Sequence, residues 1–311
     1  MTATRQSSTT SPFNFLKEGL LLPSQNRRLF AAIFTIYVAS YSLFLVAYEI
    51  GFQPLALKVL RDIYTLTSTN PRSPVYGYLL RKLHDDNHKL LLASVAYLLL
   101  AIVIGSVIQL SAVFAAVTTY SGEVHTFGTL LGKARAQLKG PVFTLAFVYA
   151  LVIAAVSLLS VLAALLVFLA FNRHFELLLA GSLVLLVAYA LYFYLCFVCS
   201  LGVVVAVAEP GRCGAGAVGR AWQLVVKGGQ RRAILLMTVT SALIAVVSPF
   251  YWLTKICSVS GALLLGFLYT VLMAAVDLFG VCALTAFYYE CKERADQPPE
   301  MEYVKLSIQD V

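Results

Sequence analysis

The chain has 311 residues, of which 60% are hydrophobic and only 12% are charged. Soluble domains carry about 25% charged residues, so this composition excludes an ordinary soluble protein and indicates one that sits in a lipid bilayer. The net charge of +8 fits a protein facing anionic lipid, and we expect no binding to nucleic acid.

Six long apolar stretches predict the fold class. They cover about residues 29–50, 90–120, 141–171, 177–208, 233–254 and 261–289. A helix needs about 20 apolar residues to cross the hydrocarbon core of a bilayer, and each stretch meets that length. The sequence therefore predicts an all-α polytopic membrane protein, with a six-helix transmembrane domain over 29–289. An N-terminal arm over 1–28 precedes it, and a tail over 290–311 follows.

The basic residues predict the orientation. Fifteen of the 23 Lys and Arg residues lie in the arm, the tail and the loops after the second and fourth spans, and eight lie on the opposite side. Loops rich in Lys and Arg stay in the cytosol, so we predict that both termini are cytosolic. We also predict that this multi-pass protein is located in the endoplasmic reticulum or the plasma membrane.

A short amphipathic helix is expected before each odd-numbered span. Apolar residues recur with helical spacing over 127–138 and again over 218–226, and a Lys-Gly pair follows each copy, at 139–140 and 227–228. A weaker copy in the N-terminal arm puts Phe13, Leu16 and Leu20 on one face. This pattern favours three parallel repeats of two spans each. The alternative is that any cytosolic segment before a span tends to be amphipathic and basic.

These amphipathic segments are the predicted contacts with the membrane surface. Helices of this kind lie in the headgroup plane, with aromatic residues inserted and basic residues facing phosphate. An alternative, compatible with the first, is that they pack on the cytosolic ends of the bundle. The expected contact residues are Phe127, Lys133, Arg135, Lys139, Arg220, Trp222 and Lys227.

Asp277 is the only charged residue well inside an apolar stretch. A carboxylate within a bilayer is costly and is a functional candidate by default. The alternative is a structural hydrogen bond between helices. Its candidate partners are Gln109, Tyr149, Ser157, Ser160 and Tyr194.

The polar segments contain no recognisable catalytic motif. There is no Gly-rich phosphate loop and no GxSxG elbow. His84 and His88 have helical metal-ligand spacing but lack the Glu of a zinc protease motif. Cys196 and Cys199 form a CxxC inside a span, where packing is the better interpretation. We expect no enzymatic activity, no cofactor and no metal site.

The predicted function is therefore that of a non-enzymatic membrane scaffold or lipid-interacting protein, with anionic lipid as its expected partner. The alternative is a small-solute or proton-coupled transporter or channel that uses Asp277.

Three segments carry a family resemblance. They are 13–19 (Phe-Asn-Phe-Leu-Lys-Glu-Gly), 216–228 after Glu209-Pro210, and 287–292 (Phe-Tyr-Tyr-Glu-Cys-Lys). Together they resemble a family of uncharacterised plant six-span membrane proteins, which is distantly similar to the membrane domain attached to some glycerophosphodiester phosphodiesterases. The resemblance covers nearly the whole chain and implies a six-span fold. It implies no catalytic residues, because the phosphodiesterase barrel is absent here.

Overall fold

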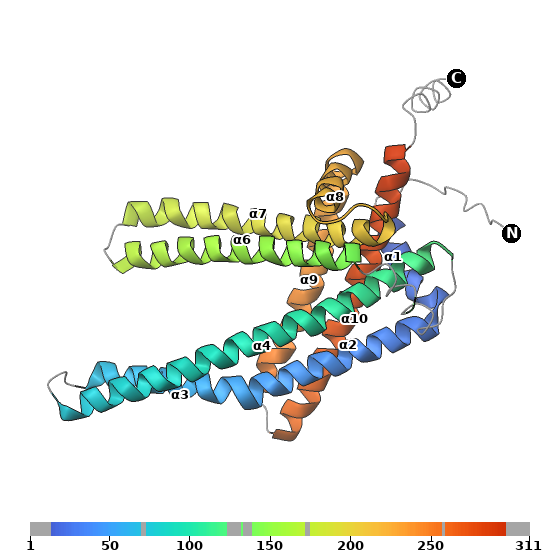
Figure 1. The fold of residues 1–311 in the computed structure, drawn as a ribbon. Helices are drawn as coiled ribbons and strands as arrows, with labels where there is room; N and C mark the ends of the chain where they lie inside the picture. Colours follow the sequence, from blue (N-terminus) through green and yellow to red (C-terminus); the bar gives the residue numbers. More distant parts are fainter. Residues whose placement is uncertain are drawn as a thin grey trace, which may run out of the picture. The chain divides into compact units, whose positions relative to one another are not determined.

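A computed structural model describes residues 14–69, 73–122, 132, 139–171, 175–256 and 259–296. Its helices are α1 (Asn14–Gln25), α2 (Arg27–Ala47), the π-helix η1 (Tyr48–Phe52), α3 (Gln53–Ser68), α4 (Pro74–Tyr120), α6 (Lys139–Phe171), α7 (Phe175–Ala208), α8 (Ala215–Gly228), α9 (Gln230–Thr254) and α10 (Val259–Asp296) (Figure 1). The described residues form no strand.

Six helical segments are long and apolar enough to cross a membrane, which confirms the predicted all-α polytopic fold. They are Arg27–Ser68, Val75–Tyr120, Lys139–Ala170, Leu177–Ala208, Gln230–Thr254 and Gly261–Ala295. Some helices extend well beyond the apolar stretches seen in the sequence. The 47 residues of α4 are about 70 Å long at 1.5 Å per residue, which is roughly twice the hydrocarbon thickness. The polar first part of α4 therefore continues the helix outside the bilayer.

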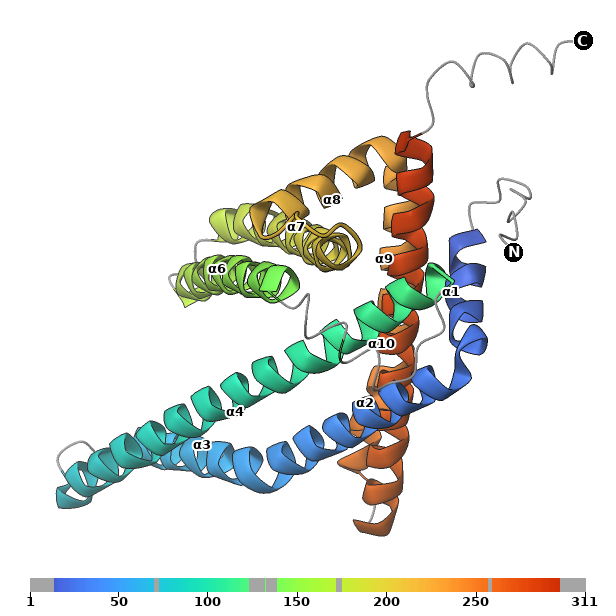
Figure 2. The ribbon, with the colours of Figure 1, turned by 45° about the vertical axis from the view of Figure 1, so that its right-hand side comes forward.

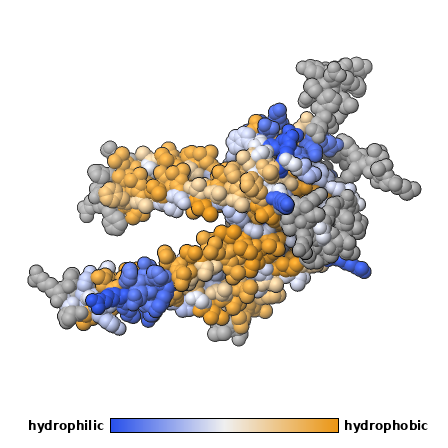
Figure 3. Space-filling view, in the orientation of Figure 1, coloured by the Kyte–Doolittle hydropathy of each residue, from blue (hydrophilic) through white to orange (hydrophobic). Residues whose placement is uncertain are grey.

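The chain divides into two compact units, and α2, α4, α9 and α10 contribute residues to both. Unit 2 comprises Ala31–Gln109 and Ile244–Val276. Its hydrophilic part is formed by α3 and the start of α4, where the polar surface is blue in Figure 3. Two ion pairs join these helices, Lys82 Nζ to Asp62 Oδ1 at 3.0 Å and Lys58 Nζ to Asp86 Oδ2 at 2.9 Å. Both carboxylates are buried, so removal of either lysine would leave a buried charge without its partner.

A second polar group in unit 2 connects η1 to the end of α9. Lys255 donates to both carboxylate oxygens of Glu49 and, at 2.9 Å, to Gln53 Oε1. Tyr251 donates to the same carboxylate at 3.4 Å. Burial lowers the pKa of the Lys255 ammonium, but its hydrogen bond to Glu49 and the nearby negative charge outweigh that effect and leave its pKa above the ordinary value. Lys255 therefore stays charged at neutral pH.

Unit 1 comprises Met1–Phe30, Leu110–Leu243 and Asp277–Val311. In it, α6 and α7 lie side by side as an antiparallel hairpin, and much of their surface is apolar and exposed (Figures 1 and 3). Such a surface suits contact with lipid. The buried core lies elsewhere, at the C-terminal ends of α4, α7 and α10 and the inner faces of α1 and α8. Its largest fully buried side chains include Phe15, Leu22, Leu201, Leu224, Phe287 and Tyr288.

Helix α1 packs against α10 through the face that carries Gly19. A Cβ placed on Gly19 would lie 2.6 Å from Ala283 Cα, so only glycine permits this approach to α10. Phe15 packs edge-on against Phe287, with ring centroids 5.8 Å apart. Leu20 is 68% exposed, so the predicted apolar face with Leu16 and Leu20 is not the face of α1 that packs on α10. Phe13 lies outside the described residues.

Candidate functional site

The amphipathic helix predicted over 218–226 is present as α8, and its inner face is anchored in unit 1. The side chains of Ala217, Ala221, Leu224 and Val225 are buried. A Cβ on Gly202 of α7 would lie 3.0 Å from Val218 Cγ2, so the two helices pack closely (Figure 2). The predicted stripe included Trp222 and Val226 in place of Ala217 and Leu224. Ala217 and Ala221 on the inner face are small enough to allow this close approach.

The outer face of α8 carries apolar residues that are not buried in the core. Trp222 is 51% exposed and Val226 is 58% exposed, and Lys227 beside them is exposed. The Trp222 ring contacts Tyr194 of α7 edge-on, with centroids 5.3 Å apart and planes at 83°. This contact orients the indole. The helix thus presents an apolar and basic surface on a fixed support.

The loop before α8 is bound to the start of α6. The buried hydroxyl of Thr144 accepts a hydrogen bond of 2.8 Å from Gly214 N and donates one of 2.9 Å to Gly140 O. Gly214 has φ +58°, and a Cβ there would lie 2.6 Å from Phe143, so glycine is required. Lys139 is the exposed first residue of α6, whereas Lys227 lies in the last turn of α8. The two Lys-Gly pairs therefore occupy different structural positions.

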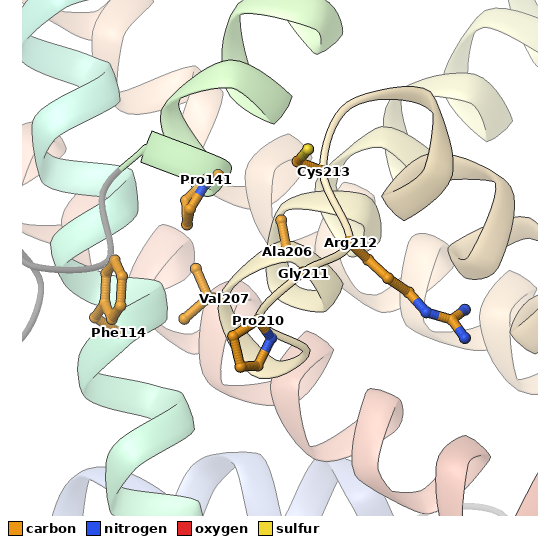
Figure 4. Close-up of a pocket in the computed structure, with 9 residues that line it drawn as sticks. Phe114, Pro141, Ala206, Val207, Pro210, Gly211, Arg212 and Cys213 are labelled. Atoms are coloured by element: carbon orange, nitrogen blue, oxygen red, sulfur yellow. The ribbon is translucent and has the colours of Figure 1, made fainter.

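A pocket of about 290 Å³ adjoins this loop. Figure 4 shows that Arg212 extends away from Phe114, Pro141 and Val207, so the pocket interior is mainly apolar. Its volume is at the lower limit of small-molecule sites, roughly 300–1,000 Å³. The pocket suits an apolar group and offers no catalytic constellation. Its lining residues are Phe114, Gly140, Pro141, Ala206, Val207, Pro210, Gly211, Arg212 and Cys213.

A charged cluster lies where α7 and α10 end. The Tyr288 hydroxyl, on a fully buried side chain, donates 2.9 Å to Glu209 Oε1. Arg212 Nε lies 3.3 Å from Glu209 Oε2, and Lys292 Nζ lies 3.7 Å from Oε1. The same Lys292 ammonium lies 5.8 Å from the centre of the Tyr288 ring. Together with Arg220 of α8, these residues form what we call the Glu209 cluster.

Arg220 is the member of the cluster that comes from the surface helix. It is half-buried, and it lies close enough to Tyr288 to interact with it electrostatically. Its Nε atom is buried and has no hydrogen-bond partner among the described residues. The sequence predicted that Arg220 faces phosphate together with Lys227. In the structure Lys227 is exposed and Arg220 is half-buried.

A second ion-pair group joins α9 to the end of α10. Arg232 donates to Glu290 Oε1, and Arg294 donates to the same oxygen at 3.0 Å. Arg232 and Glu290 are both largely buried. Ion pairs of this kind hold helix ends together when each charge has its partner.

Asp277 lies half-buried in α10, next to the buried residues Val276 and Leu278. Of its expected partners, Ser157 and Ser160 donate within α6, to Ile153 O and Val156 O at 2.8 Å each. The hydroxyl hydrogens of both serines are therefore already donated to backbone carbonyls within α6. The functional role of Asp277 stays a prediction.

Several other predicted positions can be placed briefly. Phe127, Lys133 and Arg135 lie outside the described residues. His84 and His88 are both exposed on α4, and the described part of the chain contains no group of three or more His, Cys, Asp and Glu residues that could hold a metal.

The sequence did not reveal the Glu209 cluster. Glu209 precedes one of the segments that carry the family resemblance and Tyr288 lies in another, and neither was predicted as a site residue. The one available signal was a carboxylate at the end of an apolar span, close to several basic residues. Such a signal does not identify the partner, because Tyr288 lies far away in the chain.

Comparison with known protein families gave a match. Residues 7–301 match a family described as "Domain of unknown function (DUF8558)". Neither the curated proteins nor the solved structures gave a match.

Proposed function

The chain belongs to the DUF8558 family, which is defined by a domain of unknown function, and we propose that it is a non-enzymatic membrane protein that engages anionic lipid through α8. The observation that carries this proposal is the exposed Trp222–Val226–Lys227 surface on a helix whose other face is buried.

Physical chemistry supports lipid as the partner of this surface. Tryptophan favours the membrane interface, where its ring meets apolar chains and its N–H meets polar groups. Lysine beside it adds attraction to an anionic headgroup, worth about 1 kcal/mol per basic residue near the surface. The anchored inner face of α8 means that this surface is ordered before lipid binds, so little conformational entropy is lost on binding.

Helix α1 repeats the arrangement of α8. Its inner face packs through Phe15, Gly19 and Leu22, while Leu20 and Leu21 are exposed. Both helices precede a membrane span, as the repeat hypothesis expects. We propose that α1 adds a second apolar contact with the bilayer surface.

The likeness to plant six-span proteins, and through them to the membrane domain of phosphodiesterases, stays a prediction. It agrees with the proposal in one respect, since that resemblance transfers no catalytic residue to this chain.

The tryptophan content of the chain allows a direct test. There are two tryptophans, so Trp252→Phe leaves Trp222 as the only indole. The full-length variant is reconstituted into liposomes containing lipids brominated at different depths along the acyl chain. We expect bromine near the headgroup to quench Trp222 fluorescence more strongly than bromine near the bilayer centre. Anionic lipid should increase the quenching relative to neutral lipid.

The matched control is Trp222→Phe, which leaves Trp252 of α9, an exposed residue inside a predicted span. Its fluorescence should respond to brominated lipid with no dependence on headgroup charge. If aqueous iodide quenches Trp222 and brominated lipid at every depth does not, α8 does not contact the bilayer and the proposal is wrong.

A further inference from the structure

Arg220 has no counter-ion in the described part of the structure. Its Nε atom is buried without a hydrogen-bond partner, and its charge lies within electrostatic range of the Tyr288 phenol. An unsatisfied donor on a charged group is costly, and it is more costly when it is partly removed from water. The arrangement is therefore incomplete without an acceptor near Arg220.

The one carboxylate of the Glu209 cluster is already occupied. Its Oε1 accepts from Tyr288 and pairs with Lys292, and its Oε2 pairs with Arg212. Arg212 and Lys292 thus share this single carboxylate, and Arg220 makes no ion pair with it. With three basic residues and one carboxylate, the cluster carries an excess of two positive charges, and Lys292 lies 5.8 Å from the centre of the Tyr288 ring.

We propose that the Glu209 cluster binds a phosphate group, with the Arg220 guanidinium as its main donor. This inference rests on the proposed function and deepens it, because it names the chemical group that is recognised. A planar guanidinium matches the oxygens of phosphate through two parallel hydrogen bonds, and such charge-assisted bonds are about twice as strong as neutral ones. Lys292 and Arg212, which are more exposed, add point charges at the rim.

A phosphate of this kind has two sources, the headgroup of a phospholipid or free phosphate in solution. The proposed role of α8 favours the headgroup, because Arg220 and the exposed Trp222 belong to the same helix. The two sources make different predictions for a soluble competitor.

The experiment measures binding of dioleoyl phosphatidic acid to the purified full-length protein in a neutral detergent, by native mass spectrometry. The test variant is Arg220→Gln. The matched control is Arg231→Gln, which removes the same charge from an exposed position in the same unit. We expect Arg220→Gln to weaken binding about tenfold or more, as loss of hydrogen bonds to a charged group implies. The control should change binding less than about twofold.

A parallel arm titrates inorganic phosphate against the lipid-bound protein. Failure of millimolar phosphate to displace the lipid identifies the headgroup as the source, while displacement that Arg220→Gln abolishes identifies free phosphate. Either result supports the phosphate site. Equal binding by wild type and Arg220→Gln overturns the proposal, as does equal weakening by the Arg231→Gln control.

Two further variants keep the test decisive if Arg220→Gln misfolds. Arg220→Lys keeps the charge but cannot form the two parallel bonds, so intermediate binding is expected. Lys292→Gln removes a rim charge and should weaken binding less than Arg220→Gln. Unchanged binding in both variants also overturns the site. Fluorescence quenching of Trp222 is measured in the same variants, so that loss of the phosphate site is distinguished from failure of α8 to meet the bilayer.

Discussion

The Tyr288 hydroxyl donates a 2.9 Å hydrogen bond to Glu209 Oε1, which joins the last turns of α10 to the residue that follows α7. Tyr288 is fully buried, and the Glu209 side chain is largely so. The bond therefore fixes the ends of two membrane helices at the position where Arg212, in the loop after α7, and Lys292 of α10 pair with Glu209.

The first prediction concerns this bond. Tyr288→Phe keeps the ring and its contact with Lys292 but removes the donor, so that Glu209 loses one of its partners. A hydrogen bond to a charged group contributes roughly 1.5–3 kcal/mol. We expect the free energy of unfolding to fall by about that amount and the thermal midpoint in detergent to fall with it.

Tyr189→Phe is the matched control for this change. Tyr189 lies on α7 and is exposed, with ring contacts to Tyr192 and Phe193 that phenylalanine would keep. Its stability should stay within about 0.5 kcal/mol of wild type. Equal thermal midpoints for the two variants would show that the Tyr288 hydroxyl does not stabilise unit 1.

The second prediction uses one chemical change at two glycines. Gly19→Ala puts a methyl group 2.6 Å from Ala283 Cα, and this backbone contact cannot be relieved by a side-chain rotation. We expect a loss of about 1–3 kcal/mol, or detachment of α1 from α10. Tryptic cleavage after exposed Lys17 should then become faster.

Gly219→Ala is the control, because nothing lies within 4 Å of a Cβ at that position of α8. Alanine favours a helix over glycine by about 1 kcal/mol, so this variant should be at least as stable as wild type. The two substitutions are thus expected to have opposite signs. A common sign would contradict the close packing of Gly19.

The membrane spans could be predicted from the sequence because each depends only on a local run of apolar residues. The length of α4 could not, since its polar start around Arg81 and Lys89 gives no transmembrane signal and is held by ion pairs with α3.

The buried faces of α1 and α8 show a second limit. The spacing of apolar residues located both helices but did not select the side that packs inward. That choice depends on small residues, Gly19 in α1 and Ala217 with Ala221 in α8, that meet a partner helix closely. The Glu209 cluster could not be predicted for a related reason, since it forms between segments 79 residues apart in the chain.

The third prediction tests the orientation with native cysteines. Cys213 is exposed in the loop before α8, while Cys199, Cys282 and Cys291 are buried. If both termini are cytosolic, Cys213 is cytosolic as well, and Cys257 lies on the opposite side. A Cys257→Ser variant should not react with a membrane-impermeant maleimide in intact cells.

Selective permeabilisation of the plasma membrane should allow the same variant to react, and an added Cys213→Ser substitution should abolish the reaction. This design works in the plasma membrane and in the endoplasmic reticulum, because both expose their cytosolic side to the reagent. Reaction in intact cells, or no reaction after permeabilisation, would reverse the predicted topology.

The fourth prediction concerns Asp277, the basis of the alternative function as a proton or solute carrier. Asp277→Asn keeps the shape of the side chain and removes its titratable proton. If lipid binding is the function, neither wild type nor variant should carry protons in proteoliposomes, and the substitution should lower stability by about 1 kcal/mol through a weaker interhelical hydrogen bond.

Asp85→Asn, at an exposed position of α4, is the control for loss of a carboxylate. Proton flux in wild type that survives Asp85→Asn and is lost in Asp277→Asn would establish the carrier function. A carboxylate that relays protons must gain and lose its charge within the bilayer, and asparagine cannot do so.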